Sequence, residues 1–229
     1  MRDAFHEQLR GVLEHLMEMG GLVESMLQLA TRAVIDHTER AAVESDLLYR
    51  EERVNSLQNE IDEECVRITA RQQPVASDAR FLFVASRAAT DVERVGDQAV
   101  NVLDNAKYLW QRGGDGVHIP DDLINLAKLV QKMVADALGA LITRDIELAE
   151  AVFTDEEKAN GYRDAIFRSL LREMITDPLA AQQSMSLVLI SRNLERVGDH
   201  ATNIAEEVVY LVRGQEIRHK FDRSNRLAG

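Results

Sequence analysis

The chain has 229 residues, of which 45% are hydrophobic, 29% charged and 5% aromatic, and its formal net charge is −12. This hydrophobic content is ordinary for a globular protein and excludes a chain that is disordered throughout. The acidic balance, with no basic helix and no RNA-binding motif, excludes a nucleic-acid partner.

Two further features concern the environment of the protein. The first residues, MRDAFHEQLR, are charged and include no apolar signal region, and no apolar run approaches the roughly 18 residues that a bilayer requires. We therefore expect a cytoplasmic protein. The single cysteine, Cys65, cannot form an internal disulfide, and its core-like helical position predicts an inert buried thiol.

Apolar residues recur at spacings of three and four along the first half of the chain, which is the pattern of long amphipathic helices. The stripe from Leu9 to Ala33 and the stripe from Phe81 to Leu109 are the clearest. The pattern predicts helices over residues 3–37, 41–71 and 77–111. No strand pattern occurs between them.

A stretch rich in glycine and proline at 111–120 interrupts the pattern near the midpoint and is the predicted linker. Asp177 and Pro178 have the residue types of an N-cap and a first helical position. The second half is predicted to form helices over 119–143, 146–175 and 178–213.

A nine-residue motif is repeated in the third and sixth predicted helices. Residues 93–101, Glu-Arg-Val-Gly-Asp-Gln-Ala-Val-Asn, return at 195–203 as Glu-Arg-Val-Gly-Asp-His-Ala-Thr-Asn, an offset of 102 residues with seven of nine positions identical. The helices before them share a weaker echo at an offset of 105. Such self-similarity indicates an internal duplication. We therefore predict an all-α fold of six long antiparallel helices in two tandem, duplicated three-helix bundles, residues 1–112 and 113–229.

Polar residues with oxygen atoms stand four apart in both copies of the motif. At about 100° per residue they fall within one band roughly 80° wide, opposite the apolar seam, so we expect them to face the bundle surface. Each preceding helix offers a glutamate and an asparagine beside its own seam. The candidate ligands are Glu93, Asp97, Asn101, Glu195, Asp199, Asn203, Glu51, Asn55, Glu156 and Asn160.

Oxygen ligands at i, i+4 and i+8 suit a divalent or transition metal ion, namely magnesium, manganese, iron or zinc. An acidic outer face is more often simply solvated. Two features favour metal here. Like charges at i, i+4 destabilise a helix by about 0.2–0.5 kcal/mol unless they are neutralised. Glycine inside a helix costs about 1 kcal/mol relative to alanine, yet Gly96 and Gly198 both precede the aspartate, which predicts a close approach to the backbone there.

These motifs resemble those of the PhoU family of bacterial phosphate-signalling proteins. Both copies have the form Leu/Val-Glu-Arg-Val-Gly-Asp-x-Ala-x-Asn and follow a helix rich in Glu and Asn. The segment from Ile61 through Pro74 to Arg80 is similar to the family's connection between its second and third helices. The resemblance covers essentially the whole chain. It implies surface metal clusters at the two motifs. Where the family pattern has Asp on the preceding helices, this chain has Asn55 and Asn160.

The same resemblance implies an accessory protein and negative regulator of phosphate uptake and of the phosphate-starvation response, not an enzyme. The implied partners are the ATPase subunit of the phosphate ABC transporter and a membrane sensor histidine kinase. We expect a homodimer that reaches the membrane only through these partners.

Two other functions stay open. A metal-free helical adaptor would use the same rigid helices, and metal analysis would distinguish it. A carboxylate-bridged di-metal enzyme needs two Glu-x-x-His motifs that project into a bundle core. The only Glu-x-x-His here is Glu216 to His219. Two polar residues at the motif are not expected to be metal ligands. Asp91 is expected to contact Arg87, and His200 is expected to be a surface residue.

Overall fold

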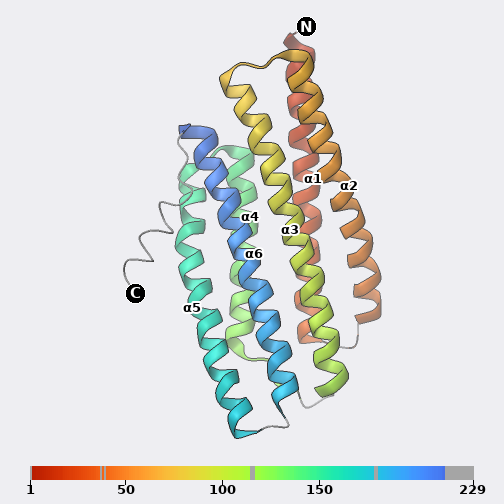
Figure 1. The fold of residues 1–229 in the computed structure, drawn as a ribbon, viewed down its shortest axis with the longest axis vertical. Coiled ribbons are helices and arrows are strands. Elements are labelled where there is room, and N and C mark those ends of the chain that lie inside the picture. Colours follow the sequence, from red (N-terminus) through yellow and green to blue (C-terminus); the bar gives the residue numbers. More distant parts are fainter. Residues whose placement is uncertain (1, 37, 39, 114–116, 178–179, 215–229) are drawn as a thin grey trace.

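The computed structural model describes residues 2–36, 38, 40–113, 117–177 and 180–214, and this part of the chain consists of six helices without a strand (Figure 1). The predicted all-α fold is thereby confirmed. None of the described helices combines the length and the apolar character that a membrane span requires. The helices are α1 (Arg2–Ile35), α2 (Arg40–Gln72), α3 (Ala76–Gly113), α4 (Asp121–Thr143), α5 (Ile146–Thr176) and α6 (Ala181–Arg213).

The helix ends differ from the predictions by a few residues, for local reasons. Pro120 has extended backbone, φ −61° and ψ 139°, so α4 begins at Asp121 instead of 119. Asp145 caps α5, since its side chain accepts a hydrogen bond from the Leu148 amide. Asp177 ends α5, and α6 begins only at Ala181. The predicted helix start at Pro178 lies outside the described residues.

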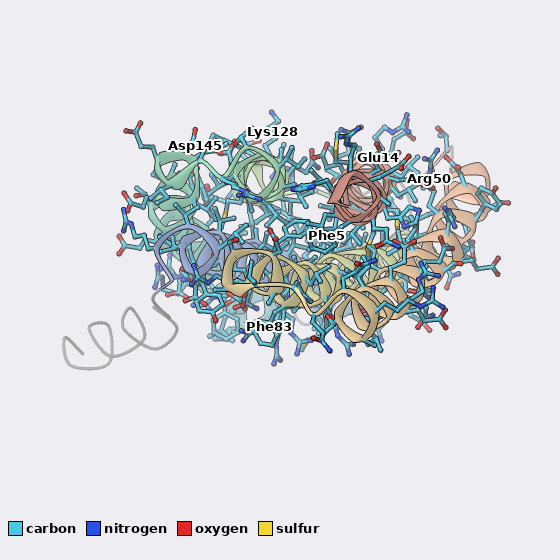
Figure 2. All side chains as sticks on the ribbon, turned by 90° about the horizontal axis from the view of Figure 1, so that it is seen from above. Phe5, Glu14, Arg50, Phe83, Lys128 and Asp145 are labelled. Carbon is cyan, nitrogen blue, oxygen red and sulfur yellow. The ribbon has the colours of Figure 1, made fainter. Side chains whose placement is uncertain are left out.

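The six helices pack as two sets of three that share a long seam. α1, α2 and α3 pack against one another, as do α4, α5 and α6, while α3 runs along α6 and α1 contacts α4. Seen from above, α1 and α4 lie on one side of the molecule and α3 and α6 on the other (Figure 2). This arrangement places both copies of the repeated motif on the same face.

The apolar stripes meet in one continuous core that includes residues of all six helices. Leu16 and Met26 of α1, Val95 of α3 and Val197 of α6 are at most 1% exposed. Cys65 is buried in this core, as predicted, and burial raises the pKa of its thiol to about 12. A thiol with such a pKa is a poor nucleophile at neutral pH.

Candidate metal clusters

The first acidic cluster lies between α2 and α3 and consists of Glu51, Glu93 and Asp97. Burial, followed by the negative charge of Asp97, raises the pKa of Glu93, and the same two causes raise the pKa of Glu51. Two buried oxygens here accept no hydrogen bond, Oδ1 of Asn55 and Oε2 of Glu93. Oxygen atoms that accept no hydrogen bond, next to crowded carboxylates, are the chemistry that a hard cation satisfies.

The second acidic cluster lies between α5 and α6 and consists of Glu156, Glu195 and Asp199. Burial and then the charge of Asp199 raise the pKa of Glu156. Asp199 is exposed on α6, but desolvation by the surrounding protein and then the charge of Glu195 raise its pKa to about 6. Asn160, one turn after Glu156, is half-buried. The duplicated sequence therefore produces two carboxylate clusters, and in each of them burial and a neighbouring negative charge raise carboxylate pKa values.

The two clusters differ in the cation that each already contains. In the first, Arg94 Nη1 donates to Asp97 Oδ2 at 3.1 Å from the same exposed helix face, and Arg94 Nε lies 3.5 Å from Glu93 Oε2. In the second, Arg163 of α5 donates through Nη1 to Glu195 Oε1 at 2.6 Å. At the offset of 105, the counterpart of Arg163 is the neutral Gln58. Among the residues that the structure describes, only the second cluster therefore receives a guanidinium from the neighbouring helix.

The repeated motif is less exposed than its sequence phase predicts. The side chains of Glu93 and Glu195 are only 17% and 15% exposed, since α2 and α5 pack beside α3 and α6 and cover one side of each motif. Asn101 is exposed as predicted. The carboxylates thus lie in the grooves between neighbouring helices.

Other motif residues join the two bundles. His200 Nδ1 lies 3.0 Å from Asp91 Oδ1, and Asn203 Nδ2 donates to the same oxygen at 2.9 Å. The expected contact of Asp91 with Arg87 is wrong: Arg87 instead pairs with the buried Glu207 of α6 at 3.2 Å. His200 is half-buried at the seam, not a surface histidine. Sequence reasoning missed these contacts because they join α3 to α6.

The glycines of the motif face neighbouring helices. A Cβ on Gly96 would lie 3.4 Å from Cε of Met26, and one on Gly198 would lie 3.4 Å from Cε of Met133. The close approach predicted from these glycines therefore comes from α1 and α4. They bring α3 and α6 against the core and do not open the backbone to a ligand.

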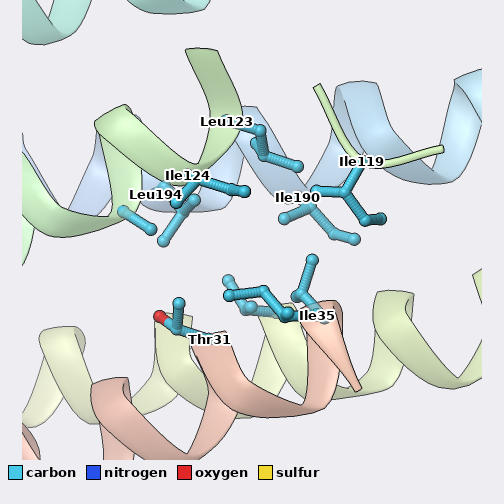
Figure 3. Close-up of a pocket in the computed structure, with 10 residues that line it drawn as sticks. Thr31, Ile35, Ile119, Leu123, Ile124, Ile190 and Leu194 are labelled. Atoms are coloured by element: carbon cyan, nitrogen blue, oxygen red, sulfur yellow. The ribbon is translucent and has the colours of Figure 1, made fainter. Parts of the chain in front are cut away.

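The two acidic clusters do not form a complete metal site in this structure. Among the described residues, no three His, Cys, Asp or Glu side chains are placed to hold one ion. A separate cavity near the junction of the bundles is almost wholly apolar (Figure 3). Its one polar lining group, the Thr31 hydroxyl, accepts a hydrogen bond from Gln131 at 2.8 Å. The carboxylate clusters therefore hold the candidate donors, and metal binding stays a prediction.

Comparison with known proteins places this geometry in a family. The PhoU domain model matches the chain twice, over residues 16–106 and 123–208. The phosphate-specific transport system accessory protein PhoU homolog of Pseudomonas aeruginosa is 38% identical over 215 residues, which cover 94% of this chain and 88% of that protein. The accessory protein PhoU of Escherichia coli is 30% identical over the same shares of both chains.

Solved structures agree with this match. The crystal structure of PhoU from Pseudomonas aeruginosa superposes with a TM-score of 0.87 at 37% identity, over 92% of this chain and 100% of that one. The PhoU structure from Streptococcus pneumoniae shares the fold, with a TM-score of 0.80 at 23% identity, over 93% of this chain and 99% of that one. Each of the two PhoU domain matches contains one copy of the repeated motif, and the chain has the fold of a solved member. This chain therefore belongs to the PhoU family.

Proposed function

We propose that this chain is a cytoplasmic accessory regulator of phosphate transport, not an enzyme, and that it binds metal ions at its two acidic clusters. The relatives named as accessory proteins of the phosphate-specific transport system support the regulatory role. The observation that carries the proposal is the duplication: α3 and α6 each bring a glutamate and an aspartate beside a glutamate of the preceding helix, and in both clusters burial and mutual repulsion raise carboxylate pKa values.

In this proposal Glu51, Glu93 and Asp97 hold one metal group, and Glu156, Glu195 and Asp199 hold the other. Asparagine oxygens on the same helices are neutral additional donors. Crowded carboxylates suit divalent or transition ions, namely magnesium, manganese, iron or zinc. The bound ion would supply positive charge that removes the repulsion within each cluster.

The regulatory step follows from that change of charge. A ligand shifts an equilibrium only if it binds one state more tightly than the other. Bound cations would convert two acidic patches on one face of the protein into neutral or cationic patches, which changes the affinity of that face for a charged partner. The proposed partners are the ATPase subunit of the phosphate transporter and a membrane sensor histidine kinase, with a homodimer as the proposed assembly.

A metal-free adaptor is the second candidate, because Arg163 already supplies a cation to Glu195 at 2.6 Å. Elemental analysis of the purified chain distinguishes the two. Stoichiometric bound metal supports the regulator with metal clusters, whereas metal-free protein that is still functional in cells supports the adaptor.

The regulatory role is tested by deletion of the gene in the source organism. As the proposed protein holds the phosphate-starvation response off, a starvation-gene reporter should be active in the deletion strain even in phosphate-rich medium. A reporter that stays low and phosphate-responsive would contradict the role. A genome search for a second chain with the doubled Glu-Arg-Val-Gly-Asp motif provides the control for redundancy.

A further inference from the structure

An exposed apolar surface lies where α3 and α5 end and α6 begins, at the lower end of the molecule in Figure 1. Its members are large apolar side chains that are between 40% and 56% exposed, and apolar side chains gathered in this way mark interaction sites more often than single exposed ones do. We call this set the distal apolar surface. It consists of Tyr108 of α3, Phe167 and Leu171 of α5, and Met185 and Leu189 of α6.

Contacts between the helices place these side chains at one level. Ser184 Oγ donates a hydrogen bond to Glu173 Oε2 at 3.2 Å, and Arg163 Nη1 donates one to Glu195 Oε1 at 2.6 Å. These two contacts define the antiparallel register of α5 against α6. Phe167 and Leu171 follow Arg163 at intervals of four and so continue the side of α5 that is turned to α6. On the other side of α6, Tyr108, Met185 and Leu189 line a shared pocket with Asn105.

The duplication supplies an internal comparison. At the offset of 102, Tyr108 corresponds to Tyr210, Met185 to Phe83, and Leu189 to Arg87. At the upper end of the seam these counterparts contact one another: the rings of Phe83 and Tyr210 lie 6.4 Å apart, and Arg87 lies 4.9 Å over the Phe83 ring.

The upper end of the seam is also closed by the ion pair between Arg87 and Glu207. At the lower end Leu189 and Asn105 occupy the corresponding positions, and neither can form that pair. Within the described residues Tyr108 has no ring contact. The seam is thus closed by the protein's own side chains at one end and left open at the other.

Three exposed arginines lie on the helices of the open end, although the chain as a whole carries −12. Arg168 and Arg172 on the exposed side of α5 and Arg192 on α6 form no ion pair with any residue that the structure describes. Of the carboxylates on these helices, Glu173 accepts a hydrogen bond from Ser184 Oγ at 3.2 Å, and Asp104, one turn before Tyr108, is paired with Lys107 at 2.9 Å. Arginine beside exposed apolar and aromatic side chains is the composition of interface hot spots.

We propose that the distal apolar surface is a docking site for an acidic amphipathic helix of a partner protein. Phe167 and Leu171 stand four apart on α5, and Met185 and Leu189 stand four apart on α6, where they line the pocket with Tyr108. This spacing matches the i, i+4 anchors by which an amphipathic helix binds an apolar surface. The three arginines select acidic residues on the flanks of that helix. This inference names the partner surface of the proposed regulator and rests on that role, but its test requires neither metal nor a phosphate response.

The experiment uses the full chain in its native cell, with Leu189 replaced by the photo-crosslinking residue p-benzoylphenylalanine. The matched control carries the same residue at Val66, the counterpart of Leu171 at the offset of 105, which is 71% exposed on α2. Mass spectrometry of the Leu189 adduct should identify a peptide that is net acidic and has apolar residues at helical spacing. The Val66 adduct should lack it.

A synthetic copy of that peptide should then bind the purified chain. L171D/L189D should weaken binding about tenfold or more, because the apolar anchors are lost. R168E/R192E should weaken it about tenfold at low salt and less at high salt. Both variants alter exposed residues, and unchanged thermal melts would show that they fold.

Several results would overturn the proposal. Crosslinking to a second copy of this chain, to lipid, or to a basic or extended peptide would each contradict it, as would an adduct no stronger than that at Val66. So would a peptide whose affinity is unchanged in both variants. A deletion strain that loses phosphate control while the crosslink fails would overturn this surface and leave the proposed regulatory role intact.

Discussion

At the scale of single residues, six carboxylates are held where their charges repel one another. Glu51, Glu93 and Glu156 all have raised pKa values because burial disfavours the charged form and a neighbouring aspartate adds to it. Asp199 is the clearest case, with a pKa raised to about 6 by desolvation and then by Glu195. Ionisation of these four groups therefore disfavours the folded state.

Asp199→Asn should therefore stabilise the metal-free protein at high pH. A raised carboxylate pKa means that the folded state holds more protons than the unfolded state, so stability falls as pH rises from about 4 to about 6. The variant should gain up to about 1 kcal/mol at pH 7.5, a figure reduced for the exposure of Asp199, and nothing at pH 4. Urea unfolding in chelator measures this, with the exposed Glu14→Gln as control. An equal gain at both pH values would contradict the assignment.

Arg163 should compete with metal at the second cluster. Its hydrogen bond to Glu195 at 2.6 Å occupies a proposed ligand oxygen, and a bond between charged groups contributes about 1.5–3 kcal/mol. Arg163→Gln should therefore strengthen Mn²⁺ binding at that cluster about tenfold or more in calorimetry. Arg168→Gln, which removes an exposed arginine from the same helix, should leave the affinity unchanged. Equal affinity in all three proteins would sink the prediction.

The sequence predicted the acidic residues of both clusters but not this competitor. Glu156, Asn160 and Arg163 stand at i, i+4 and i+7, a spacing that places them on one helix side. That spacing was available as a signal. The partner of this helix side depends on how α5 packs against α6. Periodicity within a single helix does not predict that packing.

At the scale of the helices, apolar periodicity predicted all six elements to within a few residues, since each long helix needs a continuous seam to pack. One departure is at α4, where Pro120 takes extended backbone and delays the helix to Asp121. The phase of the motif was also correct relative to the seam. The exposure of the motif was overestimated. The apolar seam of a helix indicates which side is buried against the core, but it does not indicate which side chains the neighbouring helices α2 and α5 cover.

The motif glycines should not tolerate a β-branched side chain, because neighbouring helices pack closely against them. A Cβ on Gly96 would lie 3.4 Å from Met26 and 3.6 Å from Val23, so the extra carbons of Gly96→Val would overpack the contact with α1. We expect a loss of about 1–3 kcal/mol in the free energy of unfolding. Gly161→Ala is the control: its Cβ meets nothing within 4 Å, and the variant should gain about 0.5–1 kcal/mol. A neutral Gly96→Val would contradict the packing role.

At the scale of the whole molecule, the duplication brings two similar bundles together along α3 and α6. The repeated motif predicted that both halves would present similar chemistry, and the structure places both clusters on one face. It did not predict the contacts of Asp91 with His200 and Asn203, because these join residues 109 and 112 positions apart. Such contacts follow from the docking of the two bundles, in which the two copies of the motif become non-equivalent.

In the proposed function, the paired clusters carry the regulatory role. The most direct test is complementation of the deletion strain in phosphate-rich medium, with a phosphate-starvation reporter as the measurement. The unaltered chain should return the reporter to its low level. The chain with E93A, D97A, E195A and D199A should accumulate as a folded helical protein with no bound metal, and should leave the reporter high. If this variant restores the low level as well as the unaltered chain does, the clusters are not the regulatory site and the account is wrong.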